Sequence, residues 1–137
     1  MRRSFGFTLI ELLVAMALIS LLATIGMSSY TASRRNARNA KRRGDITALQ
    51  TAFEQRYIAN NGAYPASCAA IVTEGYIQGA FPSDPLPGWD TYSGTSSCIT
   101  SSYCFCAHLE NTQGNASNGS CTFSGSPLEW FCVQNQQ

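Results

Sequence analysis

The chain has 137 residues, enough for one domain of ordinary size and too few for a second large core. Its formal net charge of +1 conceals an uneven distribution, because residues 34–43 hold six of the nine basic residues while residues 57–137 carry five acidic residues and no basic one. The chain is therefore an apolar start, a basic collar (residues 34–43) and a mildly acidic remainder. This acidity argues against a C-terminal region that binds nucleic acid.

The apolar run at residues 7–27 is long enough to span a bilayer, and Arg2 and Arg3 before it place the N-terminus on the cytoplasmic side. Glu11 is the only charged residue between Arg3 and Arg34. A carboxylate at this depth is costly unless it has a partner. A removable secretory signal or a plain membrane anchor are alternatives. The run is long for a signal and lacks a clear A-x-A site, and an anchor leaves Glu11 unexplained.

One helix is expected from about Phe7 to Asn60, because no proline occurs before Pro65. The run Asn61-Gly62 supplies a left-handed residue that ends the helix, and Pro65 prevents it from resuming. At 1.5 Å per residue the helix is roughly 80 Å long, too long for one globular domain unless half of it projects. In its second half, apolar residues at spacings of three and four form one stripe: Ile46, Leu49, Phe53 and Tyr57.

Six cysteines lie in the C-terminal region, at positions 68, 98, 104, 106, 121 and 132. An even number behind a membrane-directing N-terminus favours a disulfide framework in an oxidising compartment. A metal site is the alternative, since Cys104, Cys106 and His108 lie close in sequence, but a second ligand pair with zinc spacing is missing. Direct pairing of Cys104 with Cys106 closes too small a ring, so twelve of the fifteen pairings remain open.

Residues 103–110 alternate as a strand. One face carries Tyr103, Phe105, Ala107 and Leu109 and is expected to pack on the helix stripe. The other face carries Cys104, Cys106, His108 and Glu110 and is expected to lie beneath loops. Residues 128–134 form a plausible neighbouring strand, with a polar loop at 111–120 between the two.

The N-terminal residues, Arg2-Arg3-Ser4-Phe5-Gly6 followed by Phe7-Thr8-Leu9-Ile10-Glu11, resemble the signature of type IV prepilins and type II secretion pseudopilins. The resemblance implies that a prepilin peptidase removes residues 1–6, cutting between Gly6 and Phe7, and methylates the new N-terminus at Phe7. Residues 7–30 then remain as a transmembrane and filament-core segment, and residues 31–137 form a periplasmic or extracellular head that includes the second half of the helix.

Residues 42–65 and 75–92 resemble the same family. The fold that this implies is α+β: a long N-terminal helix whose second half packs on a small antiparallel sheet, here with a disulfide-rich head. The family also suggests a role for Glu11, which can face the charged Phe7 amine of a neighbouring subunit and set the register of assembly.

Enzymatic activity finds no support, because no nucleophile–base arrangement or phosphate loop occurs and His108, the only histidine, is expected to be structural. No cofactor is expected. Asp84 and Asp90 are weak calcium candidates, since they flank the loop that holds calcium in major pseudopilins. The collar is interpreted as a solvated or inter-subunit charge belt that Asp45 or Glu54 can pair, rather than as a nucleic-acid site.

The sequence therefore predicts a pilin that polymerises into a type IV pilus-like filament. The alternatives are a pseudopilin that acts as a periplasmic piston in type II secretion, and a minor pilin that binds DNA for uptake. The expected partners are other pilin subunits, the prepilin peptidase, and an inner-membrane assembly platform with its ATPase. The precursor is expected in the cytoplasmic membrane with its N-terminus inside, and the mature chain in an extracellular pilus or a periplasmic pseudopilus.

Overall fold

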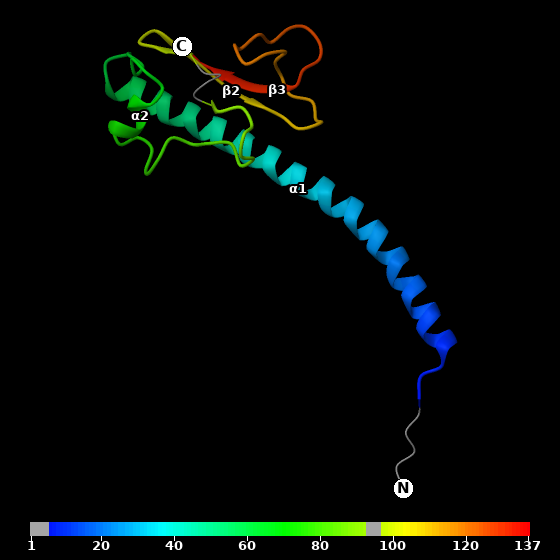
Figure 1. The fold of residues 1–137 in the computed structure, drawn as a ribbon. Coiled ribbons are helices and arrows are strands. Elements are labelled where there is room, and N and C mark those ends of the chain that lie inside the picture. Colours follow the sequence, from blue (N-terminus) through cyan, green and yellow to red (C-terminus); the bar gives the residue numbers. More distant parts are fainter. Residues whose placement is uncertain (1–5, 93–96) are drawn as a thin grey trace. The chain divides into compact units, whose positions relative to one another are not determined.

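A computed structural model describes residues 6–92 and 97–137 and gives the element order α1 (Leu9–Ala59), α2 (Ala70–Thr73), β1 (Ser97–Ile99), β2 (Ser102–His108) and β3 (Trp130–Gln134) (Figure 1). The chain divides into two compact units, Met1–Asn36 and Ala37–Gln137. The first is helical from Leu9 onwards, and the second holds the rest of α1 together with the sheet. Of the predicted leader, residues 1–5 lie outside the described residues.

Helix α1 covers nearly the whole predicted range, because nothing in residues 9–59 breaks a helix. It ends as the sequence indicates: Asn61 and Gly62 have positive φ angles of 51° and 80°, and the Gly62 N–H donates to the Tyr57 carbonyl at 3.0 Å. A Cβ at Gly62 would also lie 3.3 Å from the Tyr57 hydroxyl, a tight contact that the tyrosine ring would have to relieve by shifting. The predicted stop at Asn61-Gly62 is confirmed.

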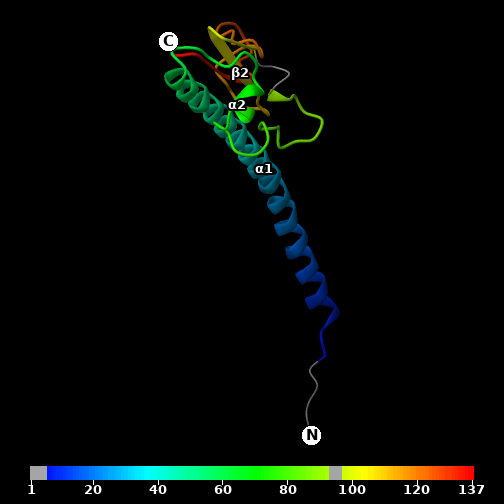
Figure 2. The ribbon, with the colours of Figure 1, turned by 90° about the vertical axis from the view of Figure 1, so that its left-hand side faces the viewer.

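The sheet has the order β1-β2-β3 and is antiparallel throughout. Strands β2 and β3 correspond to the two predicted strands, whereas β1 and α2 were not predicted. Figure 2 shows the sheet lying beside the C-terminal part of α1. The predicted α+β class, a long helix packed on a small antiparallel sheet with a disulfide-bonded head, is confirmed.

The core of the second unit forms where the helix stripe meets one face of β2. Phe53 is fully buried, and its ring lies 5.0 Å from that of Tyr103 and 4.7 Å from that of Phe105. The rest of the predicted stripe joins this cluster, and Ala107 and Leu109 are buried on the same strand face. Packing of the apolar alternation in 103–109 on the stripe is therefore confirmed.

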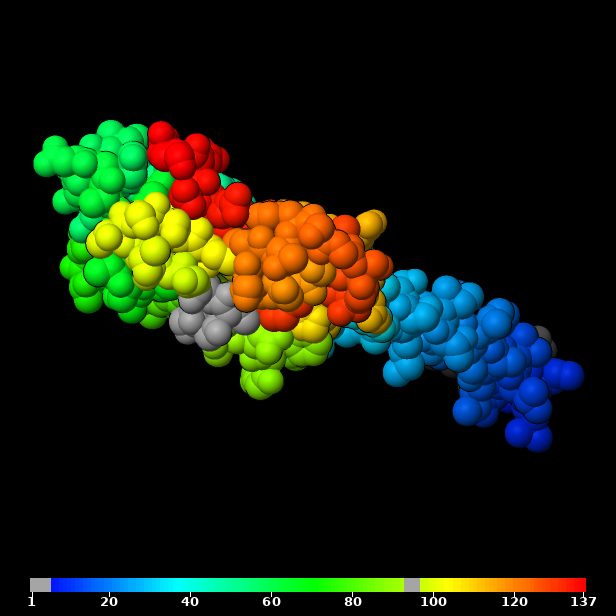
Figure 3. Space-filling view, turned by 90° about the horizontal axis from the view of Figure 1, so that it is seen from above, coloured from blue at the N-terminus to red at the C-terminus, as the bar shows by residue number. Residues whose placement is uncertain are grey.

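The opposite face of β2 carries the cysteines and is covered by the long connection between β2 and β3. Cys106 and Cys132 are buried there with Ala116, while Cys104, Cys121 and Trp130 are partly buried around them. In the space-filling view this connection, in orange, forms a bulge of the head surface beside the red C-terminal residues (Figure 3).

Candidate assembly site and the polar anchors of the head

The first unit presents an apolar surface that is exposed along its described residues. All residues from 7 to 34 are exposed, among them Leu9 at 88 % and Met27 at 73 %. Among the described residues, α1 is the one helix that is long and apolar enough to cross a membrane, judged by length and composition. A helix that is apolar on all sides is stable only against lipid or other protein chains, so this surface is the candidate assembly site.

Glu11 closes the N-terminal end of α1 through its own chain. The backbone N–H of Thr8 donates to Glu11 Oε2 at 2.9 Å, and the Thr8 hydroxyl donates to the same oxygen at 2.7 Å. In return the Glu11 N–H donates to Thr8 Oγ1 at 3.3 Å. This reciprocal pair is a capping box, with Thr8 as N-cap and Glu11 at the third helical position. The carboxylate therefore has an intramolecular partner before any neighbour is added.

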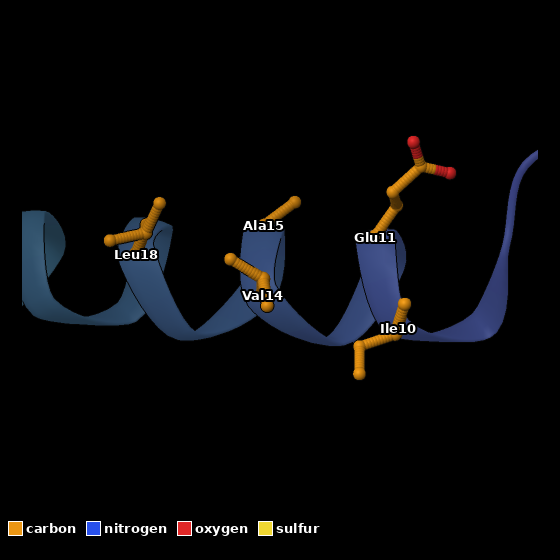
Figure 4. Close-up of a pocket in the computed structure, with 5 residues that line it drawn as sticks. All are labelled: Ile10, Glu11, Val14, Ala15 and Leu18. Carbon is orange, nitrogen blue, oxygen red and sulfur yellow. The ribbon is translucent and has the colours of Figure 1, made fainter.

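The Glu11 side chain also lies at the edge of an apolar surface. Figure 4 shows it reaching outwards on the same side of the helix as Ala15, one turn later, with Ile10, Val14 and Leu18 lining the same hollow. In the described precursor the Phe7 nitrogen is still part of a peptide bond to Gly6, so the ammonium group that Glu11 was predicted to face does not yet exist. The register role of Glu11 stays a prediction.

Arg42, from the basic collar, is fully buried in the head. Its Nε donates to Asp84 Oδ2 at 2.6 Å and its Nη2 to Asp84 Oδ1 at 2.9 Å, a two-pronged ion pair. Its Nη1 donates to Glu110 Oε1 at 2.6 Å and to Asn39 Oδ1 at 2.9 Å, and its guanidinium lies 5.3 Å from the centre of the Trp89 ring. One cation thus joins α1, the loop before β1 and the segment just after β2.

Glu110 also pairs with Arg38. The Arg38 guanidinium donates hydrogen bonds to both Glu110 carboxylate oxygens, at 2.7 and 2.5 Å. The hydrogen bond from Arg38, together with hydrogen bonds and charge from Arg42, lowers the pKa of Glu110 to about 2, although burial opposes this. The side chain of Asn39 completes the cluster, because it accepts from the Glu110 N–H and donates to the Glu110 carbonyl, both at 3.0 Å. This cluster holds α1 against two loops. Its members are the side chains of Arg38, Asn39, Arg42, Asp84 and Glu110.

The two calcium candidates have other partners in this arrangement. Both Asp84 oxygens accept from Arg42, and Oδ1 also accepts from the Leu86 N–H at 2.8 Å. Asp90 lies 3.1 Å from His108 Nδ1. A guanidinium therefore supplies the positive charge beside Asp84, and these residues do not fit a calcium site shared by Asp84 and Asp90.

The remaining collar contacts are shallower. Lys41 pairs with Asp45 at 3.0 Å one turn away, as expected, and Arg43 donates to the Gln113 carbonyl at 2.8 Å. Among the described residues, Glu54 does not pair with a basic residue of the collar. It accepts instead from the Tyr103 hydroxyl at 2.6 Å and the Tyr64 hydroxyl at 3.2 Å.

His108 lies between two indole rings, stacked 5.2 Å from Trp89 and 4.7 Å from Trp130. Its Nε2 lies 3.7 Å from Glu129, on the side away from Asp90. Because the two carboxylates approach opposite ring nitrogens and no nucleophile adjoins them among these contacts, the arrangement favours a packing role for His108.

The six cysteines form three disulfides: Cys68–Cys98, Cys104–Cys121 and Cys106–Cys132. The first ties the segment after α1 to β1. The other two fasten the connection between β2 and β3, and β3 itself, to β2. Cys104 and Cys106 each pair with a different cysteine, in agreement with the argument from ring size.

Residues 1–27 match the family described as prokaryotic N-terminal methylation motif. The chain is also 33 % identical over 78 residues to the type IV wide pilus major component PilA4 of Thermus thermophilus, a match that covers 55 % of this chain and 56 % of that protein. This chain thus spans about half the length of that relative. None of the solved structures matches it. The motif and the relative together make parts of this chain similar to type IV pilins.

Two features of these sites were missed by sequence reasoning although the sequence contains their signal. Thr8 and Glu11 have the T-x-x-E spacing of a capping box. Arg42 and Asn39 continue the helix stripe backwards from Ile46 by four and then three residues, so they lie on the buried face. A charged residue in that register indicates a buried ion pair.

Proposed function

We propose that this chain is a structural subunit, without enzymatic activity of its own, that polymerises into a type IV pilus-like filament after cleavage between Gly6 and Phe7. The observation that carries the proposal is the surface of α1 up to Tyr30. Large apolar side chains are exposed along all of it, and its one charged side chain, Glu11, is held at the helix end by Thr8. Such a surface is stable in lipid before assembly, and against the same surface of other subunits after assembly.

The arrangement supports a two-stage pathway. The precursor sits in the cytoplasmic membrane through residues 7–30, where the prepilin peptidase removes the leader and methylates Phe7. An inner-membrane platform with its ATPase then moves the apolar helix out of lipid and against the helices of other subunits. The apolar environment is kept, so transfer from membrane to filament exposes little apolar surface to water.

A surface pilus is favoured over a secretion pseudopilus by two features. The relative with 33 % identity is named as the major component of a wide pilus. The head also carries three disulfides and the Arg42 cluster, which hold its loops in place. Disulfides stabilise a head that meets proteolysis and shear outside the cell. DNA binding by the collar is disfavoured, because Arg38 and Arg42 are already paired with carboxylates.

The test is to shear filaments from the cell surface, image them, and identify their main protein by mass spectrometry. We expect this chain, starting at N-methylated Phe7, as the main protein, and no filaments in a deletion strain. A deletion that leaves surface filaments intact but abolishes protein secretion contradicts the pilus proposal in favour of a pseudopilin. A deletion that leaves filaments intact but abolishes DNA uptake favours a minor DNA-binding pilin.

A further inference from the structure

Four of the six cysteine sulfurs form one cluster on the outer face of β2. Besides the two disulfide bonds, Cys104 Sγ lies 3.6 Å from Cys106 Sγ, and Cys106 Sγ lies 3.8 Å from Cys121 Sγ. The sulfurs of Cys104, Cys106 and Cys121 all lie within 4.8 Å of one another, and Cys132 is bonded to Cys106. The third disulfide, Cys68–Cys98, is not part of this cluster.

These spacings match a tetrahedral thiolate site. With zinc–sulfur bonds of about 2.3 Å, neighbouring sulfurs of a tetrahedron lie about 3.8 Å apart. The two contacts between the disulfides already have this length. The two bonded pairs must separate, and the sulfur of Cys132, which lies outside the group of three, must approach those of Cys104 and Cys121. The Cα atoms of the pairs, 6.0 Å apart for Cys104 and Cys121 and 4.1 Å for Cys106 and Cys132, are joined by side chains that can rotate.

The backbone that carries the four cysteines is held by contacts other than disulfides. The Asn115 side chain donates to the Cys132 carbonyl at 2.8 Å and accepts from the Cys132 N–H at 2.7 Å. Ala116 and Trp130 exchange backbone hydrogen bonds at 3.0 and 3.1 Å. Gly114 packs so closely on β3 that a Cβ would lie 1.9 Å from the Trp130 carbonyl oxygen. Reduction therefore leaves the connection seated on β3, with the sulfurs close together.

We propose that the reduced head binds one Zn²⁺ through Cys104, Cys106, Cys121 and Cys132. Two equivalents of a dithiol reductant convert the two disulfides into four thiols and are themselves oxidised to disulfides. Zn²⁺ then takes the four sulfurs as thiolates, and the thiol protons pass to solvent. The oxidised head cannot bind the ion, because each sulfur is then committed to another sulfur. Disulfide formation and zinc binding are thus two exclusive ways to close the same part of the head.

Zinc is the ion of choice because thiolates are soft ligands and a closed tetrahedral four-sulfur set is the geometry of structural zinc sites. The four sulfurs are also shielded: Cys106 and Cys132 are buried, and Cys104 and Cys121 are half-buried. In a newly made, still reduced chain, the ion would hold the four cysteines in place and prevent wrong disulfide pairings. Oxidation of the thiols to the two disulfides would then release the ion.

The experiment uses the full chain in detergent, reduced with a phosphine and titrated with Co²⁺, whose tetrahedral thiolate complexes absorb strongly, followed by displacement with Zn²⁺. Two variants with equal numbers of cysteines serve as a matched pair. Cys68→Ser with Cys98→Ser keeps the cluster and is expected to bind one ion. Cys104→Ser with Cys121→Ser breaks it and is expected to lose stoichiometric binding and the tetrahedral spectrum.

Every outcome decides the proposal. Uptake by the oxidised chain, or equal uptake by the two variants, overturns it, because the ion is then bound by residues other than this cluster. Absence of uptake by the reduced chain also overturns it. If reduction loosens the head, Zn²⁺ is expected to restore its resistance to protease in the first variant and not in the second. Failure to restore it in the first variant refutes the proposal as well.

Discussion

Arg42→Met is expected to destabilise the head strongly, because it removes the cation from a buried charge cluster. Asp84, whose side chain is 3 % exposed, loses both of its bonds to Arg42 and keeps the bond from the Leu86 N–H. Glu110 keeps Arg38. Removing one partner of a buried ion pair leaves the other charge uncompensated and costs about 3–5 kcal/mol. Since domains of this kind are stable by about 5–15 kcal/mol, the loss is a large share of the total.

The assay is denaturation of the full chain in detergent at neutral pH, followed by the fluorescence of Trp89, which lies against Arg42, and of Trp130. Lys41→Met is the matched control, since Lys41 is 53 % exposed and its pair with Asp45 spans one helical turn. That control is expected to lose about 0.5 kcal/mol or less.

A second variant tests the cause of the loss. If uncompensated charge is responsible, combining Arg42→Met with Asp84→Leu recovers much of the stability, because an apolar replacement of a buried pair is often neutral. The reasoning fails if Arg42→Met is no worse than Lys41→Met, or if the double variant is no more stable than Arg42→Met alone. Either result means that the charges of the cluster do not hold the helix to the loops.

Further expectations concern processing, pH and the disulfides. Intact-mass measurement should give a mature chain that begins at Phe7 and carries one N-methyl group; an N-terminus after Ala23, as a signal peptidase leaves, contradicts the pilin interpretation. Because the pKa of Glu110 is lowered from 4.5 to about 2 in the folded chain, its contribution to stability is present above pH 4.5 and lost as the pH falls towards 2. Glu110→Gln should be less stable at neutral pH and show a flatter acid limb in denaturation at several pH values; an unchanged limb counts against the assignment. Non-reducing peptide mapping should recover three linked pairs and few free thiols, the pairs being Cys68–Cys98, Cys104–Cys121 and Cys106–Cys132.

The long elements could be predicted because their signals are local. The absence of proline and the stripe ending in Tyr57 define α1, and Asn61-Gly62 defines its end. The alternation in 103–109 defines β2 and the face that meets the helix. Strand β1, by contrast, has three residues and pairs with β2 across a two-residue turn, so it is too short for any periodicity to reveal.

The polar anchors were harder to predict because each depends on a partner far along the chain. Arg42 lies 42 residues before Asp84 and 68 before Glu110. A basic run in sequence indicates a solvated belt, and only the register of the helix stripe shows that one of its members points inwards. Disulfide partners have the same character: ring size excludes one pairing, and the arrangement of the strands and of the connection between them decides the others.

Glu11 caps its helix in the structure and is predicted to set the register of assembly, and a single substitution can separate these two roles. Its carboxylate caps α1 through Thr8, and it is the one charge available to pair with the Phe7 ammonium of a neighbouring subunit. Alanine at position 11 removes both functions. Glutamine removes the charge but keeps an oxygen at the third helical position, where it can still accept from the Thr8 N–H.

If Glu11 sets the register by ion pairing, Glu11→Gln and Glu11→Ala should both insert into the membrane, fold their heads and fail to form filaments to a similar extent. If capping is what assembly requires, Glu11→Gln should assemble and Glu11→Ala should not. Filament yield is measured against membrane-inserted protein, with Thr8→Val as the complementary variant that weakens the cap and leaves the charge. Wild-type yield from Glu11→Gln would refute the register role, since a neutral amide cannot replace the carboxylate opposite an ammonium group.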